Sequence, residues 1–339
     1  MTTGGEASSQ FRDQFAVEPI GDEGVLVNLT TGGFFRLNPT ATKACLALQD
    51  STSLSEAADR LAASMTLTPE QTASLLAGVR VQLTAPGVPT ELIGPFRYRR
   101  HGSGYALEET GRVVLTMDPA GRKLRLHAPA HTLTFKMVEY VRAVTPKLLH
   151  LRGVTVLHAS ACLLPRGLTA FSGKSGAGKT TTARAFDAAG ARLISEDLVV
   201  LTRDSRIPAV AVDGERRAHE WAAATADALV DAPEAEFDCD GLAEVSSPGP
   251  EIPLAAIWFV DRSRREGPAL RQRPFTAIDG ALALLGNNFL GSDSPESWRR
   301  HVRETHAIAR QLALWEVTMP DGLGELAAAA RAYATNTAS

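Results

Sequence analysis

The chain has 339 residues, of which 44% are hydrophobic, and its acidic and basic residues nearly balance at a formal net charge of −3. This length suffices for two or three domains with buried cores, and the balanced charge argues against nucleic acid as the main partner. The sequence has no run of about 18 apolar residues, no secretory signal, and no metal-binding spacing among its three cysteines. We therefore expect a cytoplasmic protein that binds neither nucleic acid nor a membrane and keeps its cysteines reduced.

A first module is predicted over residues 14–90, and it begins with a β-hairpin. The apolar stretches Gly24–Leu29 and Phe34–Asn38 are typical of strands, and the glycine-containing turn Thr30–Gly33 joins them.

Three helix-start signals follow the hairpin. Asn38 is a good N-cap for a helix over Pro39–Gln49. Two capping boxes, Ser53–Glu56 and Thr68–Gln71, begin two more helices, and the last is predicted to extend to about Leu83. A hairpin followed by three short helices predicts a winged-helix-like α+β domain.

Residues 91–150 are predicted as a β-rich linking segment that ends in a helix. Arg112–Met117 and Lys123–Ala128 form two strands joined by a turn that contains proline and glycine. A helix is predicted over Thr132–Leu151, and Pro146 is expected to kink or interrupt it.

The third predicted domain, residues 151–335, contains the sequence GKSGAGKT at Gly173–Thr180, which fits the phosphate-loop pattern G-x-x-x-x-G-K-[ST] in full. In such a loop the glycines let backbone amides turn toward the phosphates, Lys179 contacts the β and γ phosphates, and Thr180 offers its hydroxyl to Mg²⁺. We therefore predict ATP and Mg²⁺ as cofactors. The predicted nucleotide-binding residues are Gly173, Lys174, Ser175, Gly176, Ala177, Gly178, Lys179, Thr180 and Thr181.

Two adjacent acids, Glu196 and Asp197, lie in the apolar stretch Ala191–Leu201, which is predicted as a strand directly after the helix that follows the loop. In phosphate-loop enzymes one acid at a strand end binds Mg²⁺, and a second can act as a base. The alternative is an ordinary solvated pair in a turn. His158 precedes the loop, but a histidine among apolar residues is more often a core residue than a functional one.

The stretch Leu151–Leu201 resembles the catalytic core of HPr kinase and its relatives, which phosphorylate a serine hydroxyl. As in that family, a histidine (His158) lies 15 residues before the first glycine of the loop, and an acidic pair follows the loop lysine by 17 and 18 residues. The resemblance implies that His158 lies near the γ-phosphate, that Glu196 is the favoured base for the hydroxyl, and that Asp197 faces Mg²⁺. His158 is the alternative group that could take the hydroxyl proton. The predicted catalytic residues are His158, Lys179, Glu196 and Asp197, and the predicted metal ligands are Thr180 and Asp197.

The chain departs from this family at two points. Glu196 stands where aspartate is usual, and the run DGERR at Asp213–Arg217 replaces the later glycine-rich signature E-x-R-G-x-G. These departures weaken the case for HPr itself as the substrate and for the family's reverse phosphorolysis.

The first module is similar to PqqD-type domains, which bind the leader of a ribosomally made precursor peptide. The matching text is the hairpin Val25–Ala41, with its G-x-x-x-x-L-N form, and the three helices after it. The resemblance implies that the leader adds as a strand beside the hairpin, against the third helix. DNA binding is the weaker reading, because the third helix carries only Arg80 as a basic residue. A purely structural role for the module is a further alternative.

Together the two resemblances predict an ATP-dependent kinase that phosphorylates a Ser or Thr hydroxyl of a ribosomally synthesised peptide, with the leader held by the N-terminal domain. A kinase of a small molecule or another protein, and a non-catalytic adaptor that binds the leader and uses ATP as a switch, are the alternatives. The predicted architecture is α/β: a P-loop, HPr kinase-like nucleotide-binding core, an N-terminal winged-helix-like α+β domain and a β-rich middle segment. A homo-oligomer is compatible with the family resemblance.

Overall fold

The computed structural model describes residues 11–29, 33–73, 75–76, 92–93, 96–127, 134–174, 176–201, 208–231, 236–246, 250–261, 270–287, 295–320 and 322–336. In these residues the fold is mixed α/β, with three separate sheets. None of the helices in these ranges is both long and apolar enough to cross a membrane. The chain divides into two compact units, and each unit is made of segments that are not contiguous in the sequence. The first unit contains Met1–Thr90, Thr276–Leu282 and Gly291–Ala307, and the second contains Glu91–Phe275, Ala283–Leu290 and Ile308–Ser339.

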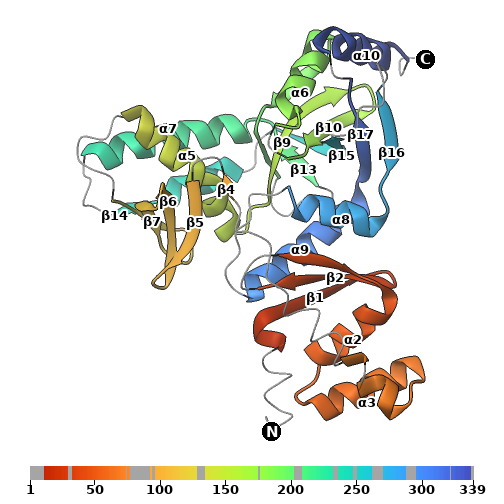
Figure 1. Ribbon diagram of the computed structural model, residues 1–339. Helices are drawn as coiled ribbons and strands as arrows, with labels where there is room; N and C mark the ends of the chain where they lie inside the picture. Colours follow the sequence, from red (N-terminus) through yellow and green to blue (C-terminus); the bar gives the residue numbers. More distant parts are fainter. Residues whose placement is uncertain are drawn as a thin grey trace. The chain divides into compact units, whose positions relative to one another are not determined.

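The first unit is built on a three-stranded antiparallel sheet of β1 (Phe15–Ile20), β2 (Glu23–Asn28) and β3 (Phe34–Leu37), in that order. The predicted hairpin is confirmed as β2 and β3, whereas β1 has no counterpart in the prediction. The helices α2 (Pro39–Gln49) and α3 (Leu54–Met65) follow the sheet in the chain (Figure 1).

The predicted helix starts of the first unit are confirmed by their caps. The side chain of Asn38 accepts a hydrogen bond from the amide of Ala41 at 2.8 Å, and Ser53 accepts one from the amide of Glu56 at 3.1 Å. In the third signal, the side chain of Gln71 accepts from the amide of Thr68 at 2.9 Å, and Thr68 accepts from that of Gln71 at 3.3 Å. The helix that begins here is described to residue 76 except at position 74, and its predicted continuation lies outside the described residues.

Both faces of the three-stranded sheet are covered within the first unit. Strand residues alternate between the two faces, and one face packs its buried Val17 and Leu26 against apolar residues of α2 and α3. On the other face Glu18 lies 3.9 Å from His306 of α9 (Pro295–Gln311). On the same face Arg36 pairs with Asp279 of α8 (Ala277–Leu285) at 2.9 Å.

The second unit contains a six-stranded antiparallel sheet in the order β14-β8-β7-β6-β5-β4. Its strands are β4 (Leu92–Ile93), β5 (Phe96–His101), β6 (Gly104–Glu109), β7 (Arg112–Met117), β8 (Lys123–Leu126) and β14 (Glu236–Asp238). The predicted strand pair of the middle segment is confirmed as β7 and β8. β14 lies more than 100 residues after β8 in the sequence. The sheet of the middle segment is therefore completed by a strand from outside that segment.

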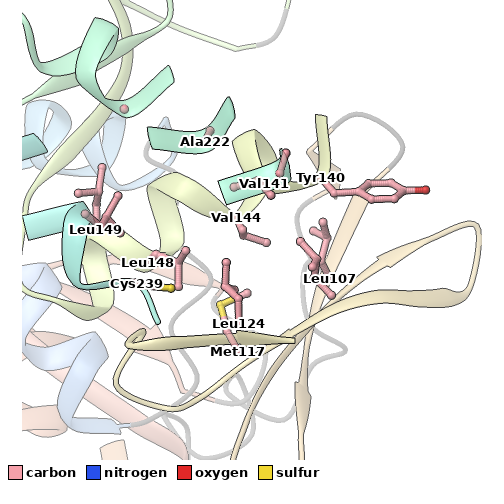
Figure 2. Packing of buried hydrophobic residues seen from close by; sticks show 14 of the residues in the cluster. Leu107, Met117, Leu124, Tyr140, Val141, Val144, Leu148, Leu149, Ala222 and Cys239 are labelled. Atoms are coloured by element: carbon pink, nitrogen blue, oxygen red, sulfur yellow. The ribbon is translucent and has the colours of Figure 1, made fainter. Parts of the chain in front are cut away.

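Two helices, α5 (Thr134–Leu151) and α7 (Gly214–Asp231), lie side by side on one face of this sheet (Figure 1). The expected interruption at Pro146 is absent, because α5 remains helical through this residue to Leu151. Between the helices and the sheet lies a core of buried apolar side chains. Figure 2 shows Val144 and Leu148 of α5 directed toward Leu124 of β8.

The third sheet runs in the order β11-β9-β10-β15-β17-β16, with β12 paired to β9 and β13 to β15. Its strands are β9 (Val156–Leu164), β10 (Gly167–Ser172), β11 (Arg192–Ser195), β12 (Leu198–Val200), β13 (Ala209–Ala211), β15 (Glu251–Asp261), β16 (Arg271–Pro274) and β17 (Ala313–Thr318). The central strands β10, β15 and β17 are parallel. The stretch predicted as one strand over Ala191–Leu201 is instead two strands, β11 and β12, which both pair with β9 and are separated by Glu196 and Asp197.

An aromatic cluster fixes two helices, α6 (Lys179–Ala188) and α10 (Leu323–Asn336), against this sheet. Phe186 of α6 stacks on Phe171 of β10, with ring centroids 5.5 Å apart. Trp258 of β15 meets the edges of Phe186 and of Tyr333 on α10, at 5.8 and 5.1 Å. Aromatic contacts of this kind hold α6 at a defined position after the strand β10.

Candidate nucleotide and phosphoryl-transfer site

The glycine loop, Gly173–Thr180, connects β10 to α6 and depends on backbone conformations that favour glycine. Gly173, Gly176 and Gly178 have φ angles of +149°, +78° and +90°. A Cβ atom at Gly173 would lie 2.7 Å from the carbonyl oxygen of Val260. A side chain at this position would therefore clash with the backbone and would also strain its own φ angle.

The N-terminus of α6 is open to an anion. Its N-cap is Gly178, and no side chain caps the first amides of the helix. Lys179 and Thr180 follow as the first helical residues, and Thr181 lies in the same turn. Uncapped amides at a helix start, glycines with positive φ and an adjacent lysine are together the features that bind phosphate in proteins. The described residues of the loop therefore fit the phosphates of a nucleotide; Ser175 lies outside the described residues.

Lys179 is nearly buried and turns back over the loop. Its side chain is 7% exposed, and its Nζ donates to the carbonyl oxygens of Gly173 and Lys174 at 3.0 and 3.4 Å. Burial lowers the pKa of the Lys179 ammonium, and the negative charge of Asp197 acts in the opposite direction. An ammonium with only carbonyl partners inside the loop is placed to exchange them for phosphate oxygens.

The acid turn, Glu196–Asp197, lies between β11 and β12, and its backbone is joined to the glycine loop. The carbonyl oxygen of Glu196 accepts hydrogen bonds from the hydroxyls of Ser160 on β9, at 2.5 Å, and Thr180, at 3.2 Å. A hydroxyl that donates its single proton keeps its lone pairs for a cation. The Thr180 hydroxyl is thus compatible with the metal-binding role predicted for it.

A residue that sequence reasoning missed holds the acid turn from the other side. The carboxylate of Glu215, in the first turn of α7, accepts hydrogen bonds from the backbone amides of Glu196, Asp197 and Leu198 at 2.8, 2.8 and 3.1 Å. Glu215 belongs to the run DGERR, which the sequence comparison treated only as a departure from the HPr kinase pattern. The one available signal was an acidic residue in the first turn of a helix, which is too common to single out a site residue.

The two acid side chains have different partners. Glu196 forms a two-point ion pair with Arg184 of α6, at 3.1 and 2.9 Å, and these hydrogen bonds lower the pKa of Glu196. Asp197 Oδ1 lies 3.2 Å from Nε2 of His158 on β9. The hydrogen bond from His158 is the main cause that lowers the pKa of Asp197; burial opposes it, and the charges of Lys179 and His219 add to it.

The structure therefore brings together most of the side chains that the sequence singled out. His158 pairs with Asp197, and Thr180 contacts the backbone of Glu196, while the Glu196 carboxylate is directed to Arg184, which the prediction did not include. Within the described ranges no three His, Cys, Asp or Glu side chains gather as a metal-binding group. Magnesium bound with a nucleotide needs only one or two protein ligands, since phosphates and water supply the rest. Thr180 and Asp197 suit that need.

A scan against protein-family models found no match, and a search of curated proteins found no similar sequence.

Proposed function

We propose that the chain is an ATP-dependent kinase that transfers the γ-phosphoryl group to a Ser or Thr hydroxyl of a ribosomally made peptide. In this proposal the second unit contains a P-loop, HPr kinase-like core, and the first unit is a PqqD-like leader-binding domain. The observation that carries the proposal is the direct connection between the glycine loop and the acid turn, through the hydrogen bond from Thr180 to Glu196. Phosphoryl transfer requires phosphate binding and acidic groups at one place, and these two segments supply both.

The roles proposed for the loop residues follow from charge and geometry. The loop amides and Lys179 hold the phosphates, and Thr180 and Asp197 hold Mg²⁺. The metal neutralises charge on the β and γ phosphates when it is bound. His158 keeps Asp197 in one orientation, because its Nε2 lies 3.2 Å from the carboxylate oxygen.

Glu196 is our candidate for the group that accepts the hydroxyl proton. Arg184 keeps its carboxylate ionised, and the exposed ion pair between them opens at little cost when the acceptor arrives. A weak base suffices, because phosphoryl transfer depends mainly on positioning and charge neutralisation. His158 is the other candidate for this proton.

The edges of the first unit's sheet support peptide binding at β3. On β1, the side chain of Gln49 accepts from the amide of Val17 at 2.7 Å and donates to its carbonyl oxygen at 3.3 Å. These contacts occupy the backbone groups that point away from β2, so an added strand cannot pair there. Next to β3, the amide of Asn28 donates to the carbonyl oxygen of Gly33, so these two residues form a hydrogen-bonded pair. Hydrogen-bonded and non-hydrogen-bonded pairs alternate along antiparallel strands. The backbone groups of Phe35 therefore face β2, and those of Phe34 and Arg36 point away from it.

β3 is therefore the edge to which we assign the leader peptide. Among the described strands only β2 pairs with β3. The side chain of Phe35 is 44% exposed and offers an apolar contact beside the edge. Strand addition would supply backbone hydrogen bonds, and tethering would raise the local concentration of the acceptor to about the millimolar range for a short flexible link.

Mass spectrometry tests the proposed function. A full-length candidate precursor peptide from the same gene neighbourhood is incubated with the protein and Mg-ATP, with Lys179→Ala as the matched control. We expect one phosphate to be added by the wild-type protein and none by the variant. A peptide without its leader should react much more slowly. Tight peptide binding without any mass change would favour the adaptor function, and equal rates with and without the leader would favour a kinase of another substrate.

A further inference from the structure

An open pocket of about 520 Å³ lies beside the acid turn in the second unit. It is bounded by β11, by the turn after β13 and by the first two turns of α7. Glu196 forms part of its wall, so the pocket adjoins the carboxylate that we propose as proton acceptor. His219 of α7 also lines it and interacts electrostatically with Asp197, the other member of the acid turn.

Two of the four carboxylates in the pocket wall serve the acid turn itself. Glu196 is neutralised by the two-point contact with Arg184. Glu215 is directed to the three backbone amides of the acid turn. The Glu215 carboxylate is therefore not available to a cationic ligand without breaking contacts that hold the turn.

The other two carboxylates share one arginine. Arg216 lies 2.7 Å from Glu220 and 3.6 Å from Asp213, in each case across one turn of α7 or its start. All three side chains are substantially exposed, and they form a small network that is closed on itself. With one arginine and two carboxylates, this network keeps a net charge of −1.

Two basic side chains in the wall have no such partner. Arg192 of β11 is exposed and forms no ion pair with any of the residues that the structure describes. His219 likewise has no hydrogen bond or ion pair there, and its electrostatic contact is with Asp197. An incoming anion would thus find two donors that no described residue already occupies.

We propose that this pocket binds the acceptor segment of the substrate and selects a hydroxyl that has a carboxylate beside it, with Arg192 and His219 as the groups that recognise the carboxylate. The inference rests on the proposed kinase function and extends it to a substrate class, an acidic acceptor segment. A guanidinium that receives a carboxylate gains specificity because its donors have fixed directions. The acceptor hydroxyl would then lie next to Glu196.

Two synthetic eight-residue peptides test this inference, each with one central serine, flanked on both sides by aspartate in one and by asparagine in the other. Phosphorylation by Mg-ATP is measured as kcat/KM at millimolar peptide. Binding of a fluorescent copy of each peptide is measured separately by anisotropy, without ATP. The proteins are the wild type, Arg192→Gln, His219→Gln, and Arg166→Gln, which removes an exposed arginine from the turn between β9 and β10, at the end of β10 away from the glycine loop.

We expect the wild type to prefer the aspartate peptide in both assays. Arg192→Gln should reduce kcat/KM and binding of that peptide by about tenfold, as expected for one lost charge-assisted hydrogen bond, and leave the asparagine peptide unchanged. His219→Gln should act in the same direction, and Arg166→Gln should have no effect. Circular dichroism of the variants verifies that they are folded.

The outcomes separate the pocket from the kinase function. Phosphorylation of both peptides with equal kcat/KM, or a loss in Arg192→Gln that is the same for both, would overturn the pocket assignment and leave the kinase standing. Binding of the aspartate peptide that depends on Arg192, without phosphorylation of either peptide, would support the pocket and contradict the kinase. Absence of binding and phosphorylation in the wild type would overturn the pocket assignment as well.

Discussion

The glycine loop and the acid turn lie next to each other, yet they are held in different ways. The loop is held by its own backbone: its glycines take positive φ angles, and Lys179 bonds to two carbonyl oxygens of the same loop. The acid turn is held by side chains from elsewhere, with Ser160 on β9 and Glu215 on α7 bonding to its backbone. The loop thus depends on local conformation, and the acid turn depends on tertiary contacts.

This difference tells where each segment is vulnerable. A substitution inside the loop changes its conformation directly, whereas the acid turn can be disturbed without altering either acid. Because the carbonyl oxygen of Glu196 accepts from Thr180, a disturbance of the turn also reaches the loop. The hydrogen bond from Thr180 to Glu196 links the described residues of the two segments. Substitutions in the loop and substitutions of the residues that anchor the turn therefore test the two segments separately.

The largest effect is expected from Gly173→Ala. The added methyl group would lie 2.7 Å from a backbone oxygen, at a φ of +149°, so the loop must shift. Strain of this kind costs about 1–3 kcal/mol, which we expect as a loss of unfolding free energy together with a loss of nucleotide affinity of at least about tenfold. Urea unfolding and ATP titration measure the two quantities. Gly176→Ala is the control, since its Cβ meets nothing within 4 Å; equal losses in both variants would mean that the clash plays no part.

The next largest effect is expected from Glu215→Gln. The amide has one acceptor oxygen and would turn an N–H group toward backbone donors, so the acid turn loses its charged anchor. Hydrogen bonds to a charged group contribute about 1.5–3 kcal/mol, which corresponds to a fall in kcat of roughly 10- to 100-fold. ATP affinity should change less, because the loop is held by its own backbone. Glu220→Gln, on the same helix, is the matched control, and an equal fall in both would contradict the anchoring role.

A smaller effect is expected from Ser160→Ala. The hydroxyl is fully buried and donates to the carbonyl oxygen of Glu196, which keeps its bond from Thr180 in the variant. We expect a loss of about 1 kcal/mol in unfolding free energy and a fewfold fall in kcat, typical of one neutral hydrogen bond. Thermal unfolding followed by circular dichroism, with Ser160→Cys as a second variant of similar size, measures this loss. No change in either quantity would show that Thr180 alone positions the turn.

The smallest effect is expected in the pH dependence of Arg184→Gln. Arg184 lowers the pKa of Glu196 below its ordinary value of 4.5, so Glu196 stays ionised to lower pH in the wild type than in the variant. If Glu196 accepts the proton, the acidic limb of kcat lies below pH 4.5 in the wild type and moves toward 4.5 in the variant. The shift should be small, because the ion pair is exposed to solvent.

The same pH profile distinguishes the two candidates for the proton. An acidic limb that stays in place in Arg184→Gln but is lost in His158→Gln would assign the proton to His158. Arg216→Gln is the control, because Arg216 pairs with Glu220 rather than with the acid turn.

The contrast between loop and turn also explains what the sequence could predict. The helix caps at Asn38 and Ser53 and the hairpin of β2 and β3 depend on residues close in the chain, and the structure confirms them. The break between β11 and β12 was missed, because an apolar run reads as one strand unless the distant Glu215 is known to capture its amides.

Distant pairings were missed for the same reason. Periodicity identified β8 but could not show that β14 completes its sheet, since nothing in a three-residue strand names its partner. The ion pair between Arg184 and Glu196 joins a helix to a turn 12 residues away, and no local pattern predicts it. The helix α5 is not interrupted at Pro146, because the surrounding core outweighs one missing amide hydrogen bond.

The place of α9 in the first unit has a consequence for how the protein is made. A ribosome adds about 5–20 residues per second, so residue 307 follows β3 by on the order of tens of seconds. During that interval one face of the first sheet, which includes Glu18 and Arg36, lacks the helices that later pair with it. A fragment that ends at residue 90 would keep this face permanently uncovered. The N-terminal sheet is begun first during translation, but its helical cover is complete only after most of the second unit has been synthesised.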